Sequence, residues 1–118
     1  MKRIISIAII WISLLSVSAQ NDYDIKRAQA CQREAEYYMR QAKNYDREVE
    51  YYNRQAQGFL CEAAYYSKRE KYDKVYDYQQ KAKNATEKAE DYDRKASKAR
   101  ERAQSYLRKA ENILKRME

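Results

Sequence analysis

The side chains that could do chemistry in this 118-residue chain are tyrosines, lysines, arginines and two cysteines. There are 13 tyrosines and no histidine, and 25 basic residues stand against 18 acidic ones. The sequence lacks the usual acid–base, nucleophile and phosphate-loop motifs. Its carboxylates lie beside Lys and Arg, which is typical of a solvated helix surface. We therefore expect no catalytic residues, no cofactor and no metal site, and we expect that the protein is not an enzyme.

The tyrosines recur at a fixed interval. Three pairs share the same offset in successive fourteen-residue units: Tyr37-Tyr38, Tyr51-Tyr52 and Tyr65-Tyr66. The first members continue a row on the outer face of a helix, made of Tyr23, Tyr37, Tyr51 and Tyr65, with Gly58 in the same row. This row predicts a protein-interaction surface. The alternative, that each ring packs on its own helix, stays open at this stage.

A second pattern shows how these side chains are held. Small residues fall at every seventh position, and a second series follows three residues after each of them. The small series is Ala28, Ala35, Ala42, Val49, Ala56, Ala63, and its companion is Cys31, Tyr38, Tyr45, Tyr52, Phe59, Tyr66. Alternating intervals of three and four are the a and d positions of a coiled coil.

The heptads stop at Tyr66 and resume at Val75 with a changed phase. This break predicts a turn at 67–73 between a helix at 22–67 and a helix at 73–117. Ser67 with Glu70 could form a capping box, and Asp73 offers a further N-cap. The predicted fold is all-α: a long antiparallel helical hairpin, an Ala/Tyr heptad coiled coil, spanning residues 20–118.

The hairpin has a definite predicted register. Starting from Tyr66 opposite Val75, Tyr78 meets Ala63 and Tyr92 meets Val49, so a large side chain faces a small one. Ala56 and Ala85 are small on both sides, where we expect a close approach. A basic row on the second helix should form ion pairs with the first. These are Glu62–Lys81, Glu48–Lys95 and Glu34–Lys109.

A local resemblance gives an alternative fold. The segment from Tyr72 to Ala82, YDKVYDYQQKA, resembles the second helix of a tetratricopeptide repeat, and the segment from Tyr45 to Tyr52 is similar. The resemblance implies short helix pairs that bind peptides. The alternative is therefore a three- or four-helix bundle or a TPR-like helical repeat.

Residues 1–19 have the pattern of a signal peptide. Lys2-Arg3 is a positive start, Ile4 to Leu15 is apolar, and Val17-Ser18-Ala19 is a small-residue cleavage site. The apolar run is shorter than the ~20 residues of a membrane span. We expect cleavage after Ala19 and export to the periplasm or the exterior, with no integral membrane segment in the mature chain.

Export would place Cys31 and Cys61 in an oxidising compartment. On one continuous helix they would be roughly 45 Å apart, too far for a disulfide within the chain. Cys31 falls at a seam position and would be a small core residue. Cys61 falls on the outer face, as a free thiol or as one half of a disulfide between chains.

These features favour an exported, non-enzymatic interaction or scaffold protein that binds a protein partner or itself as a homodimer. Its basic hairpin is similar to the hairpin-armed chaperones of the outer-membrane pathway, which implies a chaperone-like role, although the chain lacks their β-rich segment. The alternative is a binder of a polyanion or surface polymer, such as nucleic acid or an anionic envelope. Removing Lys2 and Arg3 lowers the formal net charge from +7 to +5. That modest charge disfavours nucleic acid.

Overall fold

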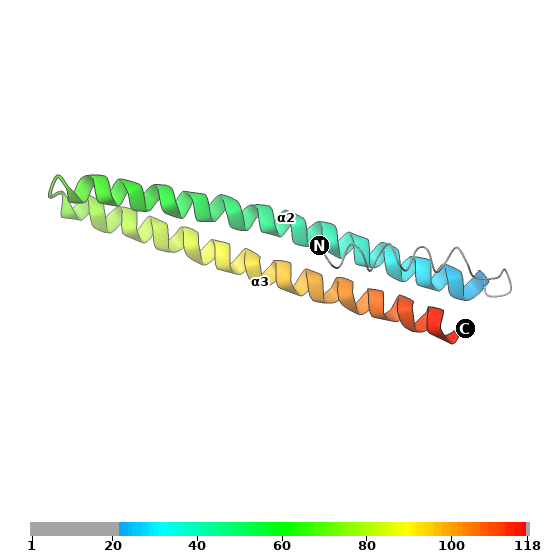
Figure 1. The fold of residues 1–118 in the computed structure, drawn as a ribbon. Coiled ribbons are helices and arrows are strands. Elements are labelled where there is room, and N and C mark those ends of the chain that lie inside the picture. Colours follow the sequence, from blue (N-terminus) through cyan, green and yellow to red (C-terminus); the bar gives the residue numbers. More distant parts are fainter. Residues whose placement is uncertain (1–21, 118) are drawn as a thin grey trace. The chain divides into compact units, whose positions relative to one another are not determined.

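The structure, a computed structural model, describes residues 22–117, which form two helices. Helix α2 spans Asp22–Ser67 and helix α3 spans Tyr72–Arg116 (Figure 1). The chain is an all-α helical hairpin with antiparallel helices, as the heptads predicted. The predicted signal peptide and its cleavage site lie outside the described residues.

The hairpin replaces the alternative folds. A three- or four-helix bundle, or a TPR-like repeat, needs at least one further helix break besides the turn. Helix α2 instead runs through the segment from Tyr45 to Tyr52, and α3 runs on beyond Ala82. The resemblance to the tetratricopeptide repeat therefore reflects only helical sequence rich in Tyr, Ala and Lys.

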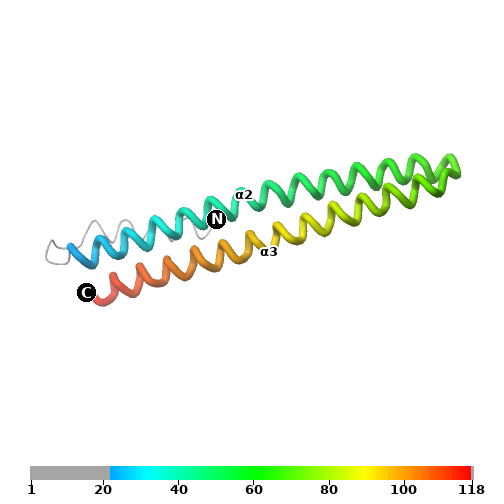
Figure 2. The backbone as a smooth tube through the Cα atoms, turned by 180° about the vertical axis from the view of Figure 1, so that it is seen from behind, coloured from blue at the N-terminus to red at the C-terminus, as the bar shows by residue number. Residues whose placement is uncertain are grey.

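A Schellman motif ends helix α2 at the turn, which joins the green ends of the two helices in Figure 2. The Lys71 amide donates to the Tyr66 carbonyl and the Glu70 amide donates to the Ser67 carbonyl, both at 3.1 Å. Glu70 has a φ of 58°, the left-handed conformation that this motif requires. Glycine normally occupies such a position because a side chain is strained there.

The start of helix α3 differs from the predicted caps. Ser67 belongs to the last turn of α2, and Asp73 already lies in the first turn of α3. The Lys71 carbonyl accepts the first helical hydrogen bonds, from the amides of Lys74 and Val75. Lys71 therefore occupies the N-cap position without a side-chain acceptor, while the Asp73 carboxylate lies favourably near the positive end of the helix dipole.

Residues 22–117 divide into two compact units. The turn unit comprises residues 42–98. Its buried core is alanine on both helices. The buried residues are Ala42, Ala56, Ala63, Ala82, Ala85, Ala89 and Ala96. Because alanine contributes little apolar area, the aromatic residues beside this row supply much of the packing.

The terminal unit comprises residues 22–41 and 99–117. Its core adds larger apolar side chains, Leu107 and Ile113, to the buried alanines. Cys31, Met39 and Tyr106 pack against this cluster. Gln32 is a fully buried polar residue.

Candidate functional site: a tyrosine–lysine face

The predicted outer tyrosines are half exposed and pack on their own helix. Tyr37, Tyr51 and Tyr65 are 47–51% exposed. Each meets the seam tyrosine that follows it edge to face, with ring centroids 5.1–5.2 Å apart. Each ring is therefore packed on its own helix along one edge and faces solvent along the other, and the interaction surface stays a prediction.

A polar group four residues later fixes each of these rings. Gln41 Nε2 donates to the Tyr37 hydroxyl at 2.7 Å, and Gln55 Nε2 donates to the Tyr51 hydroxyl at 2.8 Å. The Arg69 guanidinium lies 3.7 Å from the centroid of the Tyr65 ring. These contacts restrict the ring rotamers, so each exposed edge is presented in an ordered position.

The other two members of the predicted row are less constrained. Tyr23 is 75% exposed and has the Arg27 guanidinium 5.8 Å from its ring centroid. Asp24 follows it in place of a second tyrosine, so Tyr23 lacks the edge-to-face pair. Gly58 is helical, and a Cβ built there would meet no atom within 4 Å. Gly58 therefore places no side chain in the outer row between Tyr51 and Tyr65.

Both cysteines are free thiols in the structure. Cys31 is partly buried against the core of the terminal unit, and Cys61 is exposed.

In the turn unit, the tyrosines of α3 insert between the aromatic rings of α2. Tyr78 stacks on Tyr66 at 5.6 Å and contacts Phe59 at 6.2 Å. Tyr92 stacks on Tyr52 at 5.8 Å and contacts Tyr45 at 6.0 Å. Each α3 tyrosine therefore lies between two α2 rings that are seven positions apart. It lies opposite the small α2 residue between those rings, which is Ala63 for Tyr78 and Val49 for Tyr92. This confirms the predicted register, in which Ala63 and Val49 were the opposing residues.

The basic row of α3 covers these rings. Lys81 Nζ lies 4.9 Å from the Tyr78 ring centroid, and Lys95 Nζ lies 4.9 Å from that of Tyr92. Lys74 and Lys88 reach across to α2, over Tyr66 and Tyr52. Cation–π contacts of this kind contribute about 0.5–1 kcal/mol each at exposed sites.

The terminal unit repeats the arrangement. Tyr106 stacks on Tyr38 at 5.9 Å, with Lys109 over Tyr106 and Arg102 over Tyr38. The outer tyrosines, the seam rings and these cations of each unit form what we call the tyrosine–lysine face. In the turn unit they are Tyr45, Tyr51, Tyr52, Phe59, Tyr65, Tyr66, Lys74, Tyr78, Lys81, Lys88, Tyr92 and Lys95. In the terminal unit they are Tyr37, Tyr38, Arg102, Tyr106 and Lys109.

The prediction that the lysines of the basic row pair with glutamates of α2 was wrong. Lys81, Lys95 and Lys109 lie over tyrosine rings and make no ion pair with Glu62, Glu48 or Glu34 in the described chain. The physical reason is distance along one helix. Each lysine follows its tyrosine by three residues, so the two side chains are neighbours before any second helix is present.

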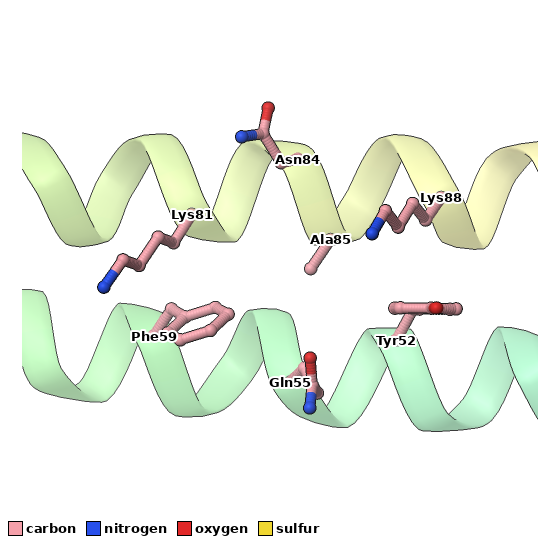
Figure 3. A pocket seen from close by; sticks show the side chains of 7 residues that line it. All are labelled: Tyr52, Gln55, Phe59, Lys81, Asn84, Ala85 and Lys88. Atoms are coloured by element: carbon pink, nitrogen blue, oxygen red, sulfur yellow. The ribbon is translucent and has the colours of Figure 1, made fainter.

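A groove opens where this aromatic series is interrupted. Ala85 occupies the α3 position that would carry a ring between Tyr52 and Phe59, and a groove of about 320 Å³ lies there. Figure 3 shows Ala85 pointing into the space between these two rings, while Asn84 points away from it. Lys81 and Lys88 lie along the same groove, and Gln55 and Asn84 complete its lining. The lining therefore combines two aromatic walls with two cations and contains no carboxylate.

A second groove in the turn unit has the opposite character. It measures about 390 Å³ and contains Glu90 and Asp93 but no cation. Its other lining residues are Val49, Asn53, Thr86 and Ala89. By heptad position, these residues belong to the side of the seam away from the basic row. The two grooves thus differ in charge, with Lys81 and Lys88 lining the first and Glu90 and Asp93 lining the second.

Sequence reasoning found the outer tyrosines but missed the groove. A usable signal was present, because the α3 series alternates Tyr78, Ala85, Tyr92 while the α2 series keeps a ring at every seventh position from Tyr38 to Tyr66. In the predicted register, Ala85 opposite Ala56 indicates a close helix approach. Both alanines are indeed buried. Beside them, however, the missing ring leaves space.

Comparison of the chain with protein-family models, with curated proteins and with solved structures found no match. Within residues 22–117, there is no helix with the length and apolarity needed to cross a bilayer. In the same residues, no cluster of His, Cys, Asp and Glu is arranged to hold a metal ion.

Proposed function

We propose that this protein is a non-enzymatic interaction or scaffold protein that binds a protein partner, or a second copy of itself, through its tyrosine–lysine face. A chaperone-like role belongs to this proposal, because a surface of tyrosine edges accepts varied apolar segments.

The observation that carries the proposal is the half-exposed outer row. Tyr37, Tyr51 and Tyr65 are each held in position by a seam ring and a polar side chain, yet keep about half of their surface in contact with water. Tyrosines of this kind are enriched in protein interfaces, since a rigid ring loses little conformational entropy on binding. The alanine-rich seam adds a reason to associate, because it buries little apolar area.

Export is part of the proposal and depends on the signal-peptide pattern of residues 1–19. Protein recovered outside the cytoplasm should begin at Gln20. A mature chain that began at Met1 would contradict export by cleavage.

Self-association supplies the first test. Two outer rows packed together would form an antiparallel four-helix bundle with two-fold symmetry. We expect the unmodified protein to dimerise in a concentration-dependent manner, measured by light scattering. The triple variant Tyr37→Lys/Tyr51→Lys/Tyr65→Lys should be monomeric and less stable, because it places charges in the proposed interface.

The matched control is the double variant Tyr72→Lys/Tyr76→Lys. Both residues are exposed tyrosines of α3 outside the tyrosine–lysine face, so their replacement should leave the dimer intact. An unmodified protein that remains monomeric at high concentration would refute self-association and leave only another partner for the row.

A second function is favoured by the positions of the cations. Because Lys81, Lys95 and Lys109 lie over rings and are not paired with the predicted glutamates, their charge is available to an anion. The alternative proposal is therefore a polyanion or surface-polymer binder. Salt distinguishes the two functions, because ion-driven binding weakens steeply as salt rises, whereas binding through tyrosine packing does not.

A further inference from the structure

We propose that the groove between Tyr52 and Phe59 is a docking slot for one aromatic side chain from an acidic peptide segment of a partner protein. The inference rests on the proposed function and specifies the chemistry of the partner. It concerns only the turn unit.

The neighbouring intervals show that a ring fits. Tyr66 and Phe59 are seven positions apart on α2, as are Tyr52 and Tyr45. In both intervals a tyrosine of α3 lies between the two rings, with centroid distances of 5.6–6.2 Å. Tyr52 and Phe59 have the same spacing, roughly 10.5 Å along a helix. In their interval α3 contributes the methyl group of Ala85 in place of a ring, so a ring from outside can occupy the place that Tyr78 and Tyr92 occupy in theirs.

The charges along the groove select the sequence around that ring. Lys88 Nζ lies 5.4 Å from the Tyr52 ring centroid, and Lys81 also lines the groove. No carboxylate lines it. An inserted side chain therefore gains an ion pair if acidic residues flank it, and it meets repulsion if basic residues do. The outer Tyr51, whose hydroxyl accepts from Gln55 at 2.8 Å, keeps the Gln55 amide beside the slot.

The opposite groove of the turn unit acts as an internal comparison. Glu90 and Asp93 line it, and no aromatic residue does. An acidic aromatic peptide should avoid that groove, so one molecule carries both the proposed site and a site that excludes the same ligand.

The test uses three short peptides of identical length: acetyl-Asp-Tyr-Asp-amide, acetyl-Asp-Ala-Asp-amide and acetyl-Lys-Tyr-Lys-amide. Proton NMR of the peptide ring is the readout, because a ring held between two others is shifted upfield by their ring currents. We expect saturable upfield shifts for the acidic tyrosine peptide only. Equal shifts for the basic peptide would overturn the charge selection, and no shift for either tyrosine peptide would overturn the slot.

The variant Ala85→Tyr should fill the slot with a ring of the chain itself. We expect it to weaken binding of the acidic tyrosine peptide by at least about tenfold by direct occlusion, and to raise the melting temperature. Ala64→Tyr, which adds a tyrosine at an exposed position, is the matched control and should bind like the unmodified protein. If Ala85→Tyr fails to fold, Ala85→Leu serves the same purpose with a smaller side chain. Binding that survives in a folded Ala85 variant contradicts the proposal.

The pair Lys81→Gln/Lys88→Gln should weaken the same peptide by roughly two- to tenfold, as loss of exposed charge contacts predicts. An oligothymidylate is titrated into the protein in a separate sample. If its base protons show larger saturable upfield shifts than the ring protons of the acidic tyrosine peptide, the slot takes nucleobases and the peptide proposal is wrong. Failure here is distinguishable from failure of the proposed function: a dimer that persists in Ala85→Tyr, with no peptide binding to any form, refutes the slot alone.

Discussion

At the residue scale, tyrosine serves both the core and the surface of this protein. The seam tyrosines stack between the helices, and the outer tyrosines pack edge-on against them. Phenylalanine could supply the ring area, but the hydroxyls of Tyr37 and Tyr51 also accept a hydrogen bond from a glutamine. A side chain with an apolar body and a polar tip suits a seam too narrow to bury it fully.

Tyr92 tests the contribution of the inserted rings. The variant Tyr92→Ala removes contacts with both Tyr45 and Tyr52. We expect the free energy of unfolding to fall by about 2–4 kcal/mol, close to the range for truncating a large aromatic residue. Chemical denaturation followed by circular dichroism measures this change.

The matched control is Tyr76→Ala, since Tyr76 is 61% exposed and its truncation should cost less than about 0.5 kcal/mol. Similar losses for the two variants would show that ring insertion does not support the seam.

At the element scale, the turn is the feature with a visible strain. Glu70 adopts the left-handed conformation at the end of α2, where a side chain costs roughly 1 kcal/mol relative to glycine. The variant Glu70→Gly should therefore raise the free energy of unfolding by about 0.5–1 kcal/mol, measured by thermal or denaturant unfolding.

A glycine elsewhere should have the opposite effect. Glu87→Gly, at an exposed position within α3, should lower stability by about 1 kcal/mol. If Glu70→Gly is equally destabilising, Glu70 is not held in the left-handed region in solution.

The helices and their register could be predicted from the sequence, while the caps and the lysine partners could not. Heptad periodicity fixes which residues share the seam, and the alternation of large and small residues then leaves one good antiparallel register. The turn carries no glycine or proline, so nothing in the sequence indicates that Glu70 takes the left-handed position. A lysine at a flanking position could meet either a carboxylate across the seam or a ring on its own helix. Both contacts stabilise the protein by a similarly small free energy, so the sequence pattern alone does not show which one forms.

The outer row was predictable only in part for a related reason. Its spacing shows that Tyr37, Tyr51 and Tyr65 share one face of α2, but spacing does not show how much of each ring remains exposed. That fraction depends on the seam tyrosine beside each ring and on the side chain four residues later. The groove at Ala85 likewise needs the register of both helices before the missing ring becomes apparent.

At the scale of the whole molecule, an alanine-rich seam and a tyrosine-rich exterior belong together. A core with little apolar area gives little stability for its length, so a protein of this kind gains from covering its exposed rings with a partner. A formal net charge of +7, or +5 after the proposed cleavage, favours solubility while that surface is uncovered. Ring packing and the lysine charges can both contribute to binding at the tyrosine–lysine face, and the dependence of binding on salt distinguishes the two.

The measurement that tests the central claim most directly is sedimentation equilibrium of the unmodified protein at about 0.1 M and about 1 M sodium chloride, where the Debye length falls from about 10 Å to about 3 Å. Association through packed tyrosine rings predicts a dimer whose dissociation constant changes by less than about threefold between the two, because apolar contacts are not screened. A dimer that dissociates more than about tenfold more readily at high salt would show that charge, and not tyrosine packing, drives binding. A monomer at every concentration would contradict self-association through this face.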